Sequence, residues 1–249
     1  MKIIANSVKE FNPIEVEDKG VIITGADNLD VLKTIPDNTV DMIYIDPPYL
    51  TNKVWEKNGW SFEDKFDDMW SFLYFLGERL VEAKRIMRTR HYQIVDDVLY
   101  EDGKVCTYEP RRDKILEDYS GKGKRKKLEK GVDVGASIFV HIDYRTNSEI
   151  KTYLLDPLFG EGKGALSWDD VQMIMESKIG ERVHTPISVP AVEISQGPDI
   201  VCDFFAGSHS TAAAAWKTGR RFISIEMNKT EDLFYKQIEG VSFGEMRKD

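Results

Sequence analysis

Met42-Ile43-Tyr44-Ile45-Asp46-Pro47-Pro48-Tyr49 is the stretch of the 249-residue chain that decides its fold. The first four residues predict a buried strand, and the two prolines end it because proline cannot donate to a sheet ladder. Further strand and helix patterns alternate along the chain on both sides of this stretch. Such alternation predicts an α/β fold with a mostly parallel sheet and helices on both faces. Open sheets of that kind bind ligands at the carboxyl ends of their strands, where residues 46–49 would lie.

Hydrophobic periodicity gives the expected elements within a single domain of residues 1–249. Apolar residues spaced by three and four predict a long amphipathic helix at 66–87. Residues 90–134 are charge-dense and weakly periodic, which predicts an insertion or a mobile flap. The other expected elements are strands at 21–23, 40–45, 137–143, 200–204 and 222–225, and helices at 27–35, 149–155 and 210–218.

Charge and cysteine content narrow the class of protein. A formal net charge of −9 argues against a protein coated with positive charge, although five of the six residues from 122 to 127 are basic. Cys106 and Cys202 are too few for a disulfide framework or a zinc site, so we expect no metal. No apolar run approaches the ~20 residues that span a bilayer, so we expect a cytoplasmic protein with no membrane partner. The basic segment comprises Lys122, Lys124, Arg125, Lys126 and Lys127.

The Asp46-Pro47-Pro48-Tyr49 tetrapeptide carries the groups that an exocyclic base amine would need. The lone pair of such an amine is delocalised into the ring, so acceptors must draw the nitrogen toward tetrahedral geometry. The Asp46 carboxylate and the Pro47 carbonyl would each accept a hydrogen bond from the amine. Pro48 would stiffen the backbone, and Tyr49 would stack on the base, a contact worth about 1–3 kcal/mol. The alternatives are a plain strand-ending turn and a proline-rich ligand.

A second motif is Val201-Cys202-Asp203-Phe204-Phe205-Ala206-Gly207-Ser208-His209-Ser210-Thr211, a strand that passes through small residues into a helix. Gly207 would let the backbone approach a nucleotide, and the N-terminus of the following helix would face a carboxylate. Glu226 ends the next strand 19 residues after Gly207, near the spacing at which an acidic side chain meets ribose hydroxyls. A plain strand-to-helix turn is the alternative.

With both motifs in hand, the chain resembles the β class of DNA amino-methyltransferases, in which the catalytic tetrapeptide precedes the cofactor loop. It looks closest to the modification subunits of type III restriction systems. The matching segments are 25–29, 43–49, 137–143 and 203–208. The resemblance implies a Rossmann-like, S-adenosylmethionine-dependent methyltransferase fold that transfers a methyl group to adenine N6 in flipped-out DNA, within a restriction-modification system. Its partners would be double-stranded DNA and either a second copy or a specificity or restriction subunit.

The same resemblance assigns roles to individual residues. Asp46, Pro47, Pro48 and Tyr49 would form the catalytic site, and Asp in the first of these positions, rather than Ser, points to adenine N6 over cytosine N4. Glu226 would hold the ribose of the cofactor. The other residues that would line the cofactor pocket are Asp27, Asn28, Asp46, Phe205, Ala206, Gly207, Ser208 and Thr211.

Departures from the family pattern leave alternatives open. His209 stands where Gly or Ala is usual and could crowd the cofactor, and residues 161–197 form only a short recognition or connector region. The basic segment would then grip DNA phosphates, or it would be a solvated loop. One alternative function is a catalytically weak or inactive nucleic-acid-binding subunit of a methyltransferase complex. Another is a methyltransferase acting on cytosine N4 or RNA. His141 reads as an ordinary core or surface residue.

Overall fold

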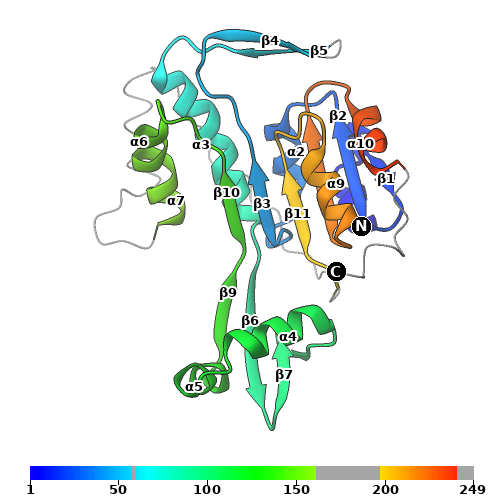
Figure 1. Cartoon of the computed structure of the whole chain (residues 1–249), viewed down its shortest axis with the longest axis vertical. Helices are drawn as coiled ribbons and strands as arrows, with labels where there is room; N and C mark the ends of the chain where they lie inside the picture. The colour runs from blue at the N-terminus through cyan, green and yellow to red at the C-terminus, as the bar shows by residue number, and fades with distance from the viewer. Residues whose placement is uncertain (58–59, 161–196, 240–249) are drawn as a thin grey trace.

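The computed structural model describes residues 1–57, 60–160 and 197–239 (Figure 1). The 161–197 connector predicted from the sequence lies outside these residues except for Gly197. A six-stranded sheet forms the centre of the molecule, and every pairing in it is parallel except that of β1 with β2. From edge to edge its strands are β1 (Ile14–Val16), β2 (Gly20–Thr24), β12 (Arg221–Glu226), β11 (Ile200–Asp203), β3 (Met42–Ile45) and β10 (Ser137–Val140).

Helices cover both faces of this sheet, as the sequence predicted. Alternate residues of a strand point to opposite faces. Val21 and Ile23 of β2 therefore join one core cluster with α2 and α3, while Ile22 joins a second cluster with α9 and α10. The helices are α1 (Lys2–Ser7), α2 (Asn28–Thr34), α3 (Met69–Ile86), α6 (Asn147–Ile150), α7 (Asp156–Phe159), α9 (Ser210–Lys217) and α10 (Glu231–Ile238), with short helical turns η1 (Lys9–Phe11) and η2 (Lys151–Leu155).

Local sequence explains where the two helices beside β3 begin. The Asp27 carboxylate accepts a hydrogen bond from the Leu29 backbone N–H at the start of α2, at 2.8 Å. At the start of α3, the Asp68 carboxylate accepts a hydrogen bond from the Ser71 backbone N–H at 2.8 Å. Such caps satisfy backbone donors that have no partner within the helix. Among the described residues, no helix combines the length and the apolar character needed to cross a membrane.

Residues 89–135 form a folded lobe inserted between α3 and β10. The basic segment lies on a helix of this lobe, so the alternative of a solvated loop was wrong. Two helices pack on a four-stranded antiparallel sheet of order β8-β7-β6-β9. Tyr92, Ile94, Leu99, Cys106, Ile115 and Leu128 give the lobe a core of its own. Its elements are β6 (Thr89–Val95), β7 (Val98–Glu101), β8 (Lys104–Val105), α4 (Glu109–Asp118), α5 (Lys122–Lys130) and β9 (Val132–Gly135).

The lobe is attached at the amino-terminal edge of the central sheet. β9 runs directly into β10, and the Ser137 N–H donates to the Asp41 carbonyl, just before β3. A β-hairpin that the sequence did not predict, β4 (Lys53–Lys57) and β5 (Trp60–Asp64), follows β3 at the opposite edge. The lobe and the hairpin therefore lie at the two ends of the molecule (Figure 1).

A buried ion-pair network joins the lobe to the sheet. Arg90 bonds both Glu101 and Asp41, with 2.6 Å between its Nη2 and Asp41 Oδ1. Arg111 bonds Glu101 at 2.9 Å and Asp199 at 2.5 Å. Asp41 and Asp199 stand immediately before β3 and β11, so two arginines of the lobe hold the entry points of two sheet strands.

We expect Glu101→Ala to lower the free energy of unfolding by about 3–5 kcal/mol, because it leaves two buried guanidinium groups without their shared carboxylate. Urea unfolding followed by circular dichroism measures the change. Glu129→Ala is the matched control in the same lobe, since its exposed pair with Arg125 is worth about 0–1 kcal/mol. Equal effects of the two substitutions would contradict the role of the network.

Candidate active site at the carboxyl edge of the sheet

Polar side chains gather where the parallel strands end. Asp46 follows β3, Asp203 ends β11, Glu226 ends β12, and His141 follows β10. Because these strands are adjacent and parallel, their carboxyl ends meet at one edge of the sheet. The two sequence motifs, which are about 150 residues apart in the chain, are thereby brought together.

The tetrapeptide offers an accessible carboxylate on a rigid base. The Asp46 side chain is 58% exposed, whereas Pro47 and Pro48 are buried beneath it. Partial burial raises the pKa of Asp46, and the neighbouring His141 opposes that rise. Asp46 therefore presents its carboxyl group to solvent at the strand end.

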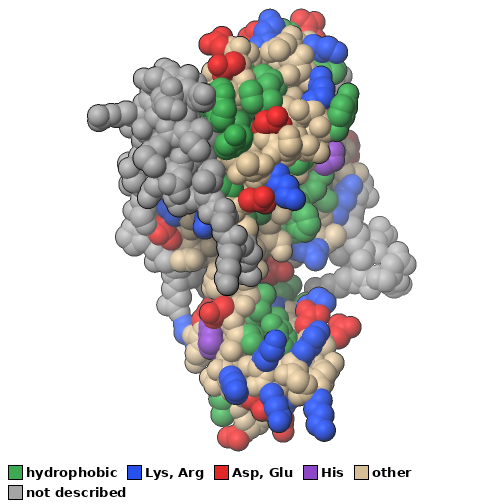
Figure 2. All heavy atoms as spheres, turned by 90° about the vertical axis from the view of Figure 1, so that its left-hand side faces the viewer, with side chains coloured by type: hydrophobic (Ala, Val, Ile, Leu, Met, Phe, Trp, Pro, Cys, Tyr) green, Lys and Arg blue, Asp and Glu red, His purple; other side chains and the backbone are tan. Residues whose placement is uncertain are grey.

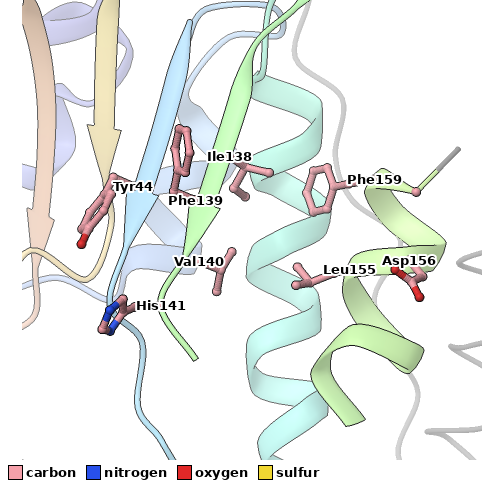
Figure 3. Close-up of a pocket in the computed structure, with 9 residues that line it drawn as sticks. Tyr44, Ile138, Phe139, Val140, His141, Leu155, Asp156 and Phe159 are labelled. Carbon is pink, nitrogen blue, oxygen red and sulfur yellow. The ribbon is translucent and has the colours of Figure 1, made fainter. Parts of the chain in front are cut away.

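His141 belongs to this site, although the sequence predicted a core or surface residue with no special role. Its Nδ1 lies 3.0 Å from the Tyr49 hydroxyl and 3.6 Å from Asp46 Oδ1. The signal that could have found it is the register, because Val140 pairs with Ile45 and the residues that follow each strand become neighbours. Figure 3 shows His141 at the end of β10, beside Tyr44 and Phe139.

Asp64 is a second residue that the sequence reading missed. It is fully buried at the end of β5, and its carboxylate accepts hydrogen bonds from the backbone N–H groups of Tyr49, Leu50 and Thr51 at 2.8–3.1 Å. The Thr51 hydroxyl donates a fourth bond at 2.6 Å. The hairpin is therefore tied to the chain immediately after the tetrapeptide.

The loop after β11 has the open backbone that the sequence predicted. Gly207 has a φ of +50°, and a Cβ placed there would meet no atom within 4 Å. Its N–H donates to Glu226 Oε2 at 2.8 Å, so the two residues assigned to the cofactor are in contact. Phe205 is half-buried beside this loop, Ala206 is buried and Ser208 is exposed.

Asp203 is a buried acid at the base of that loop. Burial raises its pKa to about 6, the charges of Glu226 and Asp46 add to the rise, and bonds from Thr211 and the Phe205 N–H oppose it. Thr211, predicted to line the pocket, thus contacts Asp203. The pairing of β11 with β3 makes the two motifs neighbours in space.

His209 does not crowd the open side of the loop. Its side chain is fully buried, with Nδ1 2.8 Å from Ser224 Oγ and Nε2 3.1 Å from Thr230 Oγ1. Its backbone adopts a φ of +61°, the left-handed conformation that favours glycine. Because the His209 side chain points inward, toward Ser224 and Thr230, it does not crowd the side of the loop where a cofactor would lie.

Asp27 and Asn28 lie at the same edge but face inward. Buried Asn28 bonds the Phe204 carbonyl and accepts from Arg79 Nε at 2.5 Å, which occupies its carboxamide. Arg79 also donates to both Asp27 oxygens and lies 3.6 Å over the Phe75 ring. Asn28 therefore supports the cofactor loop from below, whereas Asp27 stays partly exposed.

The basic segment is not part of this site. Lys122, Lys124, Arg125, Lys126 and Lys127 lie on α5, in the lobe at the amino-terminal edge of the sheet. Figure 2 shows Lys and Arg side chains over this lobe, which lies at the end of the molecule opposite the hairpin. The structure separates these residues from the tetrapeptide.

A pocket of ≈ 580 Å³ adjoins the site at the edge strand β10. Tyr44, Phe139 and His141 lie on one side of that strand, while Ile138, Leu155 and Phe159 lie on the other (Figure 3). The pocket walls are mainly apolar and aromatic, and His141 connects them with Asp46.

Sequence comparisons point to one class of proteins. A family model described as DNA methylase (N6_N4_Mtase) matches residues 192–234. DNA adenine methyltransferase YhdJ of Escherichia coli (strain K12) is 26% identical over 252 residues, covering 87% of this chain and 81% of that protein. Type II methyltransferase M.BamHI of Bacillus amyloliquefaciens is 24% identical over 265 residues, covering 91% of this chain and 59% of that protein.

Structural similarity to solved proteins is weaker. PvuII DNA methyltransferase (cytosine-N4-specific) aligns with a TM-score of 0.37 and 12% identity, over 92% of this chain and 90% of that one. A putative DNA modification methylase from Thermus thermophilus, complexed with S-adenosyl-L-methionine, aligns with a TM-score of 0.36 and 15% identity. That alignment covers 89% of this chain and 95% of the Thermus protein.

The buried imidazole of His209 makes a pH-dependent contribution to stability. Burial lowers its pKa to about 4, below the value of about 6.5 in an unfolded chain. The contribution is fully present above pH 6.5 and is lost as the pH falls from there toward 4. At pH 5 the free energy of unfolding is lower by about 2 kcal/mol for this reason.

We therefore expect His209→Asn, which tolerates a positive φ, to be less stable than the wild type at pH 7.5. The difference in free energy of unfolding between the wild type and the variant should narrow by about 2 kcal/mol at pH 5. Only the wild type loses stability there through its buried imidazole. Urea unfolding at the two pH values gives the comparison. Ser208→Ala, at an exposed residue of the same loop that does not titrate, should show no such narrowing. An unchanged gap for His209→Asn would refute the assignment.

Proposed function

We propose that this chain, whose matches support a DNA methyltransferase, transfers a methyl group from S-adenosylmethionine to adenine N6 in flipped-out DNA. The observation that carries the proposal is the pairing of β3 with β11. It sets Asp46-Pro47-Pro48-Tyr49 beside the Gly207 loop at one edge of the sheet. An amine held by the tetrapeptide and a methyl donor held by the loop would then lie within reach of each other.

The residues at this edge fit the cofactor. Open space beside Gly207 admits a ligand to the backbone, and half-buried Phe205 offers an aromatic face to an adenine. Among the described residues, neither Asp203 nor Glu226 forms an ion pair with Lys or Arg. Glu226 accepts hydrogen bonds from the Gly207 N–H and from the backbone and side chain of Asn228. Uncompensated carboxylates attract a cation. When bound, S-adenosylmethionine supplies a positively charged sulfonium that carries the methyl group.

The chain's own residues would orient the amine. The Asp46 carboxylate and the Pro47 carbonyl would each accept a hydrogen bond from one N–H of the amine. These bonds would draw the nitrogen lone pair out of conjugation with the base ring and stabilise the positive charge that develops on nitrogen. The raised pKa of Asp46 suits this task, because a more basic carboxylate is a better acceptor. Tyr49 would stack on the extruded base and offset part of the cost of unstacking it.

Adenine N6 is the proposed target because the tetrapeptide begins with Asp. The E. coli relative named as a DNA adenine methyltransferase supports this choice. We further propose a cytoplasmic role in a restriction-modification system, with double-stranded DNA and a second copy or another subunit as partners. The buried His209 removes the observation that had favoured a weak or inactive enzyme.

The decisive experiment incubates the protein with labelled S-adenosylmethionine and unmethylated genomic DNA, then digests the DNA and identifies the labelled nucleoside. We expect N6-methyladenine. Label on N4-methylcytosine, or label only in an RNA control, would overturn the proposed target. Failure to label any nucleic acid would overturn the proposed function.

We expect Asp46→Ala to lower kcat by about 100-fold or more, the scale seen when one preorganised charge-stabilising group is removed. Affinity for S-adenosylmethionine, measured by calorimetry, should fall far less than kcat, because Asp46 would only border the cofactor pocket and the loop after β11 is untouched. Near-normal turnover would contradict the role of Asp46 in orienting the amine.

Gly207→Val should abolish cofactor binding in the same calorimetric titration, because the new side chain fills the open space beside the loop. Gly103→Val is the matched control. Gly103 also has a positive φ and no atom within 4 Å of a new Cβ, but it lies in the lobe. Both variants therefore carry the same kind of backbone strain. Loss of binding in both would point to strain rather than to the site.

A further inference from the structure

The chain that follows the tetrapeptide is held in a strained conformation. Leu50 has a φ of +56° and Asn52 a φ of +57°, a region that side chains other than glycine rarely adopt, leucine least of the two. Such conformations persist only where the surroundings stabilise them, and they concentrate at functional sites. Tyr49 immediately precedes this strained turn, so the turn fixes the direction in which Tyr49 leaves the backbone.

Asp64 supplies the stabilising contacts. Its buried carboxylate accepts bonds from three consecutive backbone N–H groups, at residues 49–51, and from the Thr51 hydroxyl. Glu63 of β5 and Lys65 just after it are exposed, whereas Asp64 between them is buried. A two-stranded hairpin is marginally stable alone, and these four bonds anchor it to the catalytic loop.

His141 holds the other end of the same side chain. Its Nδ1 is 3.0 Å from the Tyr49 hydroxyl, and it is carried by β10, whose backbone is fixed against β3 through the bond from the His141 N–H to the Ile45 carbonyl. Tyr49 is thus fixed at its backbone by the hairpin and at its hydroxyl by the edge strand. These two contacts come from segments that lie on either side of α3 in the sequence.

We infer that Asp64 and His141 are positioning residues that set the Tyr49 ring in place before a base arrives, an inference that rests on the proposed function. A ring ordered in advance loses little conformational freedom when a base stacks on it. Misplacement of about 1 Å at a reacting site can cost about 100-fold in rate. Neither residue needs to touch the base or the cofactor to have this effect.

The test is a pair of double-mutant cycles on methylation of unmethylated genomic DNA. Asp64→Asn keeps the size of the side chain but replaces one acceptor oxygen with an amino group. We expect it to lower kcat by about 100-fold, while the dissociation constant for S-adenosylmethionine is unchanged. In a Tyr49→Ala background the same substitution should cost less than about threefold, because the residue it positions is already gone.

The second cycle combines His141→Phe with Tyr49→Phe. Each single substitution removes one end of the same hydrogen bond, so the double variant should be no slower than the slower single variant. If His141 acted through Asp46 instead, its substitution would remain costly in the Tyr49→Phe background. His141 is largely exposed, so this cycle stays informative even if Asp64→Asn does not fold.

Glu63→Gln is the matched control, since Glu63 is the exposed neighbour of Asp64 on the same strand and pairs with Lys65 at 3.0 Å. We expect its kcat to equal that of the wild type. Full, additive losses in the Tyr49 backgrounds, or no loss in the single variants, would overturn the inference while leaving the proposed function intact. A wild-type protein that methylates no DNA would overturn both.

Discussion

The parallel pairing of β3 with β11 on one side and β10 on the other is the constraint on which the rest of the structure depends. Cys202 pairs with Ile43 and Val140 pairs with Ile45, so the ends of these three strands lie level at one edge. Each strand is followed by a loop that carries a polar side chain. The site exists because the sheet aligns three loops from distant parts of the chain.

The acids that immediately precede β3 and β11 pair with arginine, whereas among the described residues the acid that ends β11 does not. At the amino-terminal edge, Asp41 and Asp199 pair with Arg90 and Arg111 of the lobe, which share Glu101 of β7 between them. Charge there joins two folded units. At the carboxyl edge, Asp203 is buried with its pKa raised and, among the described residues, no basic side chain pairs with it. A buried acid without a cation costs stability, which is typical of groups retained for binding.

At the same carboxyl edge, Leu50, Asn52 and His209 have a positive φ, and buried polar side chains contact these segments. Asp64 stabilises the turn at Leu50, while Ser224 and Thr230 hold the imidazole of His209, whose backbone is left-handed. In both places the strained residue adjoins a motif proposed to contact substrate or cofactor. Rigid loops on a rigid sheet are what a reaction that depends on accurate placement requires.

Much of the fold was predictable from short-range pattern. The alternation of strand and helix, the parallel sheet and its two helical faces are confirmed, because hydrophobic periodicity and strand-ending prolines act over a few residues. The sequence left open whether residues 90–134 form an insertion or a mobile flap, because the core of the lobe rests on a few scattered apolar residues among many charges. The hairpin was missed because it is exposed along most of its length and shows little burial pattern.

The sequence by itself determined where the two candidate motifs stand: a tetrapeptide after one strand and a glycine loop after another, each recognisable within a short run of consecutive positions. Only the tertiary structure decided which other residues join them. His141 reaches Tyr49 through strand register, Asp64 through the fold of the hairpin, and His209 turns inward toward β12. It also placed the α5 lysines at the far edge. Contacts between distant segments leave no periodic trace in the sequence, so they appear only once the strands are paired.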